Sequence, residues 1–306
     1  MDFKESVYSE SAGYAFYKTS FISFLRPAFI KCVSLIFYNF FFCQHRAAFL
    51  PGRIPVNNVD HSLDEKIPFV PSWVTIYLDF VYFWTRMVTF FLKRYRHRVY
   101  AQIADFVASM GRLYAFAAEV YRKNLSTTKR PFYIARPRFF LIHLLDPHLM
   151  CIPSLHVMVV IYAYKKFNAI AKSLGEEEKL KEQALEMKQG ALAISQAILY
   201  VKQHSVNCIA AALYAMTCFD PALFPSSEAE AFTALLFGPP PVSGGIPAEC
   251  RIHPSAAPST QLPEADQAEI KSHILCLYRH FLSERDEKRF WGEPLINFLR
   301  SSPVKK

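Results

Sequence analysis

Long apolar stretches separated by short polar loops fill the first 223 residues of the chain. Within 67–92 the apolar run exceeds the roughly 20 residues that a helix needs to cross a bilayer. The pattern therefore predicts an all-α fold, built as a bundle of six transmembrane helices. The six apolar segments lie at 27–48, 68–92, 101–121, 152–172, 188–203 and 205–223.

The pattern changes after residue 223. Residues 224–264 are rich in Pro, Gly, Ser and Ala, a composition typical of a disordered linker. An amphipathic helix is predicted near 265–290, with Ile270, Ile274, Leu277 and Phe281 on one face. We expect this face to pack on the membrane surface or on a partner. The chain then divides into an N-terminal cytoplasmic segment (1–26), a membrane domain (27–223), a linker (224–264) and a partly disordered C-terminal helix and tail (265–306).

Positive charge is concentrated in the membrane domain. The formal net charge is +9, and residues 225–306 hold 9 Lys+Arg against 10 Asp+Glu, so residues 1–224 carry +10. An excess of Lys and Arg marks cytoplasmic loops, which places the basic loop at 93–98 and both termini in the cytoplasm. The loop at 122–151 then faces outward although it is also basic, and anion binding is a function that would explain this exception.

The segment at 101–121 carries a stripe of charged residues. Asp105, Arg112 and Glu119 are spaced by seven, which puts them on one face of a helix. We interpret this stripe as structural, with its charges paired inside the helix bundle.

Three short polar islands stand out in loops or at helix starts that this topology places on the outer face. The first is KRPFYIARP at 129–137, in which Lys129 is followed by six residues and then Arg136-Pro137. The second is CIPSLHV at 151–157, with Ser154 and His156. The third is KQH at 202–204.

The order and spacing of these islands resemble the signature of the type 2 phosphatidic acid phosphatase superfamily. That signature reads Lys, six residues, Arg-Pro; then Pro-Ser-any-His; then Ser-Arg, five residues, His, three residues, Asp. The first two parts match completely, and PSLHV resembles the branch that includes inositol phosphorylceramide synthases. The resemblance covers about residues 20–222 and leaves the tail unexplained.

The resemblance implies a phosphoryl-transfer site that uses neither a metal nor a cofactor. A loose phosphoryl transition state needs positive charge and oriented donors, and Lys129 and Arg136 would neutralise the phosphate. Ser154 and the free amides at the start of its helix would add donors. His156 would protonate the leaving oxygen as general acid, and His204 would attack phosphorus and form a phosphohistidine.

The third island departs from the family pattern. Ala197 and Ile198 occupy the Ser and Arg positions, and Cys208 occupies the Asp position four residues after His204. A carboxylate there would hold the imidazole tautomer, and a thiol cannot replace it.

Two nearby residues are candidates to supply what is missing. Lys202 would restore the lost positive charge at the substrate phosphate, or it would simply extend toward lipid headgroups. Asn207 lies three residues after His204 on the same helical face, so its amide oxygen would accept the ring N–H, or it would serve as a helix-packing residue.

The sequence thus predicts a membrane lipid phosphatase that hydrolyses a phosphomonoester or pyrophosphate of a lipid. The alternatives are a headgroup phosphotransferase, or a catalytically impaired homologue that binds anionic lipid. We expect an integral protein of a bacterial inner membrane with an extracytoplasmic active site. Its partners would be a phosphorylated lipid and the bilayer, not nucleic acid, while the sequence leaves the oligomeric state open. Asp60, His61 and Asp64 are interpreted as a solvated loop, and no metal-ligand spacing is present.

Overall fold

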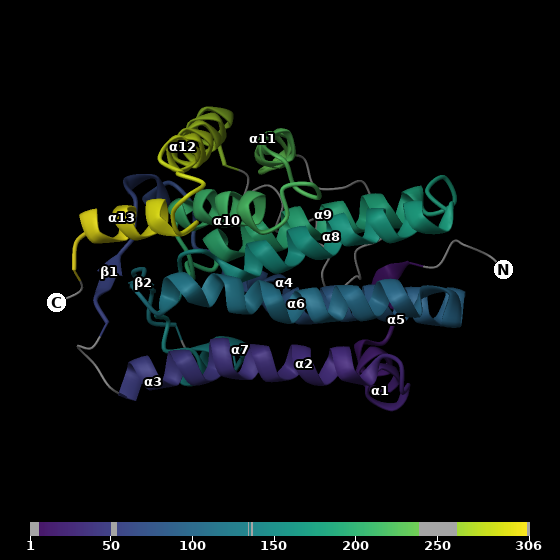
Figure 1. Ribbon diagram of the computed structural model, residues 1–306. Helices are drawn as coiled ribbons and strands as arrows, with labels where there is room; N and C mark the ends of the chain where they lie inside the picture. The colour runs from purple at the N-terminus through teal and green to yellow at the C-terminus, as the bar shows by residue number, and fades with distance from the viewer. Residues whose placement is uncertain (1–5, 50–53, 134, 136, 239–261, 305–306) are drawn as a thin grey trace.

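The computed structural model describes residues 6–49, 54–133, 135, 137–238 and 262–304, and it is mostly helical (Figure 1). Each of the six predicted apolar segments falls on helical structure. The α-helices are α1 (Ala12–Phe21), α2 (Arg26–Ile36), α3 (Cys43–Phe49), α4 (Val74–Leu78), α5 (Phe80–Tyr95), α6 (Tyr100–Tyr121), α7 (Pro137–Leu145), α8 (Leu155–Leu174), α9 (Lys181–Tyr200), α10 (Val206–Phe219), α11 (Ser226–Leu235), α12 (Glu264–Ser283) and α13 (Glu293–Ser301). Short helical turns are η1 (Val7–Ser9), η2 (Phe37–Phe42), η3 (Ser62–Glu65), η4 (Pro71–Trp73) and η5 (Arg96–Val99).

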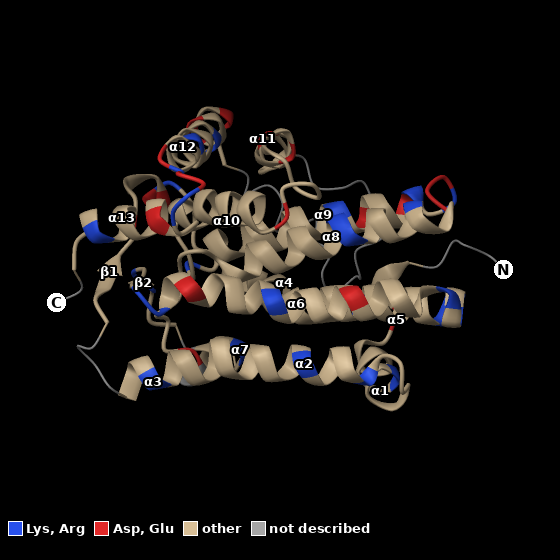
Figure 2. Cartoon of the chain, viewed as in Figure 1, with Lys and Arg blue, Asp and Glu red and all other residues tan. Residues whose placement is uncertain are grey.

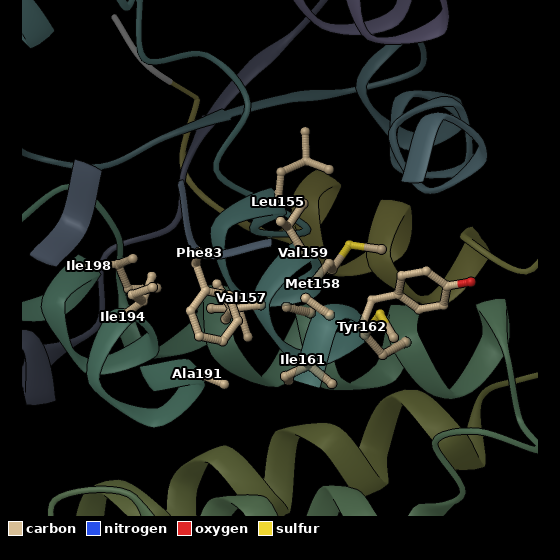
Figure 3. Close-up of a cluster of buried hydrophobic side chains, with 14 of the residues drawn as sticks. Phe83, Leu155, Val157, Met158, Val159, Ile161, Tyr162, Ala191, Ile194 and Ile198 are labelled. Carbon is tan, nitrogen blue, oxygen red and sulfur yellow. The ribbon is translucent and has the colours of Figure 1, made fainter. Parts of the chain in front are cut away.

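The core lies where α5, α8 and α9 meet (Figure 3). Phe83 of α5 packs among Val157 and Ile161 of α8 and Ile194 of α9, and all four side chains are buried. Burying a side chain of this size contributes about 1.5–3 kcal/mol relative to leaving it in water. This core fixes the start of α8 relative to the end of α9.

Local signals in the sequence set the ends of the two helices that bear the candidate histidines. α8 ends at Gly175, which adopts a left-handed φ of 68° that a residue without a Cβ takes without steric cost. α10 begins after Ser205, whose side chain accepts a hydrogen bond from the amide of Asn207.

The C-terminal helices cover α10. The α12 helix packs along α10 and buries Ile270, Ile274, Tyr278 and Phe281, while Leu277 is only half-buried. The predicted apolar face therefore packs on the protein's own bundle. Of the predicted linker, 226–235 form α11, whereas 239–261 lie outside the described residues.

Two three-residue strands, β1 (Val56–Asn58) and β2 (Leu125–Thr127), pair in parallel next to the end of the chain. The amide of Asn58 donates to the carbonyl of Pro303 (2.8 Å). At the other end of the bundle Glu10 forms ion pairs with Lys93 (2.7 Å) and Arg94 (2.6 Å). The described N- and C-terminal residues thus lie at opposite ends of the bundle (Figure 1).

One continuous helix, Arg26–Phe49, is long and apolar enough to cross a membrane among the described residues. It combines α2, η2 and α3 over 24 residues, and only 17% of its apolar window is buried in the protein. The six-span arrangement remains a prediction.

The charged stripe of α6 is on one face, as predicted, but it lies on the surface rather than inside the bundle. The side chains of Asp105 and Arg112 are 55% and 49% exposed, and Asp105 pairs with Lys166 (2.9 Å). The carboxylate of Glu119 accepts a hydrogen bond from the indole of Trp291 (2.8 Å).

Candidate functional site

Two of the predicted catalytic residues, His156 and His204, lie side by side although 48 positions separate them in the sequence. Their ring centroids are 5.4 Å apart, with the rings inclined at 68°. His156 is the second residue of α8, and His204 lies in the turn between α9 and α10. Both predicted histidines therefore face one site.

Hydrogen bonds around strand β2 hold the start of α8 in place. The amide of Ser126 donates to the carbonyl of Leu149 (3.0 Å), and its hydroxyl accepts from the amide of Ile152 (2.8 Å). The hydroxyl of Tyr121 donates to the carbonyl of Pro153. These contacts position His156 through backbone atoms that precede it by only a few residues.

The turn that carries His204 is held from two sides. Its amide donates to the carbonyl of Ile198 at the end of α9 (3.1 Å). On the other side, a carboxylate oxygen of Asp64 accepts from the amide of Val206, the first residue of α10 (2.8 Å). Asp64 is half-buried and caps α10, so the prediction that it belongs to a solvated loop was wrong.

A third histidine, His148, completes the cluster. Its ring centroid is 6.3 Å from that of His204, and its Nε2 lies 2.7 Å from the hydroxyl of Thr128. The three histidines line a pocket of about 40 Å³ whose walls also include Phe40, Gln44, Tyr77 and Phe80.

Asp146 places one carboxylate beside the histidines. It accepts hydrogen bonds from the side-chain amide of Gln44 (2.7 Å) and the backbone amide of His148 (2.9 Å). Arg130 lies 3.6 Å from the same carboxylate. Burial opposes ionisation, but the contacts with His148 and the charge of Arg130 hold the pKa of Asp146 well below its usual range. Asp146 therefore stays negatively charged, and a phosphate that enters the pocket must compete with it for the positive charge of Arg130.

The surroundings of His204 keep its imidazole neutral. Burial, with the nearby His156 and His148, lowers the pKa of His204 well below its usual value. The ring hydrogen-bonds the backbone of Cys151, and its Nδ1 has no hydrogen-bond partner among the described residues. A neutral imidazole is the form that a nucleophile requires.

His156 lies between two aromatic rings. Its ring stacks on Tyr77 at 4.4 Å and contacts Phe80 at 4.2 Å between centroids. Burial among these rings lowers the pKa of His156 to about 4. An acid role for His156 thus requires that the site binds an anion, which would raise this pKa.

Only some of the predicted phosphate-binding residues lie near the pocket. The hydroxyl of Ser154 is buried, has no partner in the described part of the chain, and precedes the first amides of α8. Lys129 is exposed and does not line the pocket, and the ammonium of Lys202 donates to the backbone carbonyl of Asp64 instead. Arg136 lies outside the described residues.

Asn207 does not hold the His204 ring. Its amide oxygen is 2.8 Å from Nε2 of His273 on α12, and its Nδ2 donates to the carbonyl of Val59 (3.1 Å). These contacts fit a helix-packing role for Asn207 better than the role of orienting the His204 ring.

No model of a known protein family, no curated protein and no solved structure matches this chain. The geometry therefore carries the functional argument by itself. Among the described residues, no three or more His, Cys, Asp or Glu side chains are arranged to hold a metal ion.

Four residues of the site were missed by the sequence reasoning: Gln44, Arg130, Asp146 and His148. Asp146 and His148 stand within ten residues of His156, in the run LDPHLMCIPSLH, so their proximity to the second island was an available signal. Gln44 comes from a distant helix, and nothing in its own sequence context indicated the contact.

Proposed function

We propose that this pocket catalyses phosphoryl transfer from a phosphorylated lipid, with His204 as nucleophile and His156 as general acid. The observation that carries the proposal is the 5.4 Å separation of the two rings at the start of α8 and α10. A ring nitrogen of His204 would attack phosphorus while the bond to the leaving lipid oxygen breaks. His156 would give that oxygen its proton.

Water would then attack the phosphohistidine and release inorganic phosphate. His156, now neutral, would accept a proton from that water, so the enzyme returns to its starting state. Ser154 and the first amides of α8 would stabilise the phosphoryl oxygens, and Arg130 would replace Lys129 as the cation of the first island. An alcohol in place of water would make the enzyme a phosphotransferase by the same steps.

A lipid is the favoured substrate because the apolar helix Arg26–Phe49 forms one wall of the pocket. Phe40 and Gln44 line the pocket, while Phe37 and Phe41 of the same helix are exposed.

A second candidate is the catalytically impaired homologue that binds anionic lipid. His204 Nδ1 has no partner where the family pattern places a carboxylate, because the amide of Asn207 is engaged by His273. In that case the protein would bind a phosphorylated lipid but release no phosphate.

The deciding experiment measures phosphate release from detergent-solubilised phosphatidic acid, phosphatidylglycerol phosphate and polyprenyl pyrophosphate. We expect wild-type turnover of at least one substrate, acid-labile phosphate on the protein, and loss of both in His204→Ala. His97→Ala is the matched control, since His97 is exposed on η5. Binding of these lipids without any release of phosphate by the wild type would favour the impaired homologue.

A further inference from the structure

Exposed apolar side chains are concentrated on one layer of the molecule. Of the seventeen large hydrophobic residues that are exposed in the described chain, eleven lie between residues 16 and 49, on α1, α2, η2, α3 and the turn between α1 and α2. We call this layer the α1–α3 face. Most are aromatic, and Phe21, Phe37 and Tyr38 are 59–68% exposed. A contiguous apolar surface of this kind marks an interaction site.

The same layer carries only positive charge. Residues 12–49 contain Lys18, Arg26, Lys31 and Arg46 and no Asp or Glu. In Figure 2 this layer shows blue on tan along α1, α2 and α3, whereas red and blue are mixed on α12. Aromatic side chains together with Lys and Arg are the composition of helices that lie in the interface of a membrane with anionic lipids.

The six other exposed large hydrophobic residues of the described chain are scattered over the rest of the bundle, among charged side chains. On α6 the exposed stripe contains Asp105 and Arg112, and on α8 Lys165 pairs with Glu228 of α11. The α12 helix covers α10 and exposes Glu264, Glu269 and Arg279, so α10 offers no apolar face on that side. Figure 1 shows α11 and α12 on the side of the bundle opposite α2.

These facts constrain how the molecule sits on a membrane. The α2 helix packs along α6, and both run the length of the bundle (Figure 1). If α2 stood across the bilayer, the charged stripe of α6 would stand in hydrocarbon too, where exposed charges are expensive.

We propose that the protein binds one leaflet of an anionic bilayer through the α1–α3 face, with α2 parallel to the membrane plane. The rest of the bundle lies in water. The attachment does not depend on the proposed chemistry. One consequence rests on the proposed function: because Phe40 and Gln44 connect this face to the histidine pocket, a lipid phosphate reaches His204 from the bound leaflet.

Spin labels on the full-length protein measure this arrangement. Cysteines replace Ile30 and Phe41 on α2 and Arg112 on α6, and native Cys250 and Cys276 are changed to serine. The protein is bound to phosphatidylcholine vesicles with phosphatidylglycerol, and depth is read from relaxation by oxygen and by a water-soluble nickel complex. We expect residues 30 and 41 at similar depth in the apolar region and residue 112 in water.

The spanning arrangement gives a different profile. Eleven helical residues separate positions 30 and 41, so their depths would differ by about 16 Å, and position 112 would lie in hydrocarbon. That profile, or no binding to the vesicles, would overturn the proposal. His204→Ala should leave all three depths unchanged, so loss of phosphate release with an intact profile would count against the chemistry alone.

Charge reversal provides an independent measurement. Lys31→Glu with Arg46→Glu should weaken partitioning to phosphatidylglycerol vesicles by at least about ten-fold, because each basic side chain near the surface adds attraction. Lys172→Glu, on an exposed position of α8, is the matched control and should have little effect. Equal loss in both variants would contradict the assignment of the α1–α3 face.

Discussion

At the level of single residues, the site is defined by what His204 lacks. Its ring is neutral and oriented only by the Cys151 backbone, and Nδ1 is left without a partner in the described part of the chain. Phosphohistidine formation places positive charge on the imidazole, so a carboxylate beside it stabilises the transition state. Cys208 is fully buried in the first turn of α10, four residues after His204, and contributes no charge of that kind.

Cys208→Asp should therefore raise turnover. A carboxylate at this position, at the start of α10, would hold the ring N–H of His204 and stabilise the developing imidazolium. We expect phosphate release to increase by about ten-fold, which corresponds to about 1.4 kcal/mol off the barrier. Initial rates are measured at matched expression, with Cys208→Asn as a control of similar size and no charge. If the aspartate variant folds but is no faster than the asparagine variant, His204 does not need an orienting carboxylate.

The pH profile follows from the two lowered pKa values. His204 stays neutral throughout, while His156, with a pKa of about 4, must be protonated to act as acid. Above pH 4 its protonated fraction rises as pH falls, so kcat/KM should increase by up to about ten-fold per unit from pH 7.5 to 5.5.

The control for this profile is His156→Ala, which keeps the ionisation of the substrate but removes that of the acid. Its rate should be low and should show only the pH dependence of the substrate. A wild-type profile that is flat, or that falls with acid, would rule out His156 as the proton donor.

At the level of elements, the sequence predicted the apolar segments well because periodicity and length decide whether a buried stretch is helical. It also predicted that His156 and His204 share a site, since the family resemblance ties the second and third islands together. It missed the environment of Asn207, because α12 comes from a region 66 residues away and periodicity does not show which element covers which. The contact of Lys202 with a backbone carbonyl of η3 was not apparent from the sequence for a similar reason.

The hydrogen bond between Asn207 and His273 should stabilise the packing of α10 against α12. Asn207→Ala and His273→Ala should each lower the free energy of unfolding, and the double variant should lose less than the sum. We expect a coupling of about 0.5–1.5 kcal/mol, the net value of one hydrogen bond. Urea unfolding of the four proteins gives the coupling. Strictly additive losses would show that the two side chains do not interact in solution.

At the level of the whole molecule, sequence patterning alone does not show which apolar residues face solvent, lipid or protein. The α8 and α9 helices are apolar because they form the core, and α10 because α12 covers it. A buried helix and a membrane-spanning helix have the same composition, so only the packing distinguishes them. The exposed aromatic residues of the α1–α3 face are different, because the described part of the chain leaves them uncovered.

The last prediction concerns whether the C-terminal helices are a separable tail or part of the core. Ending the chain after Gly238 would expose the face of α10 that Ile270, Ile274, Tyr278 and Phe281 now cover, each of which is fully buried. At about 1.5–3 kcal/mol for each side chain, the loss is similar to the 5–15 kcal/mol that stabilises a typical domain, so this truncation should not fold. Ending the chain after Ser302 removes only the strand contact at Asn57 and Asn58, and should remain folded with a slightly lower urea midpoint. If the first truncation instead unfolds cooperatively with a midpoint near that of the full chain, α12 is a dispensable appendage and α10 must be stabilised in another way.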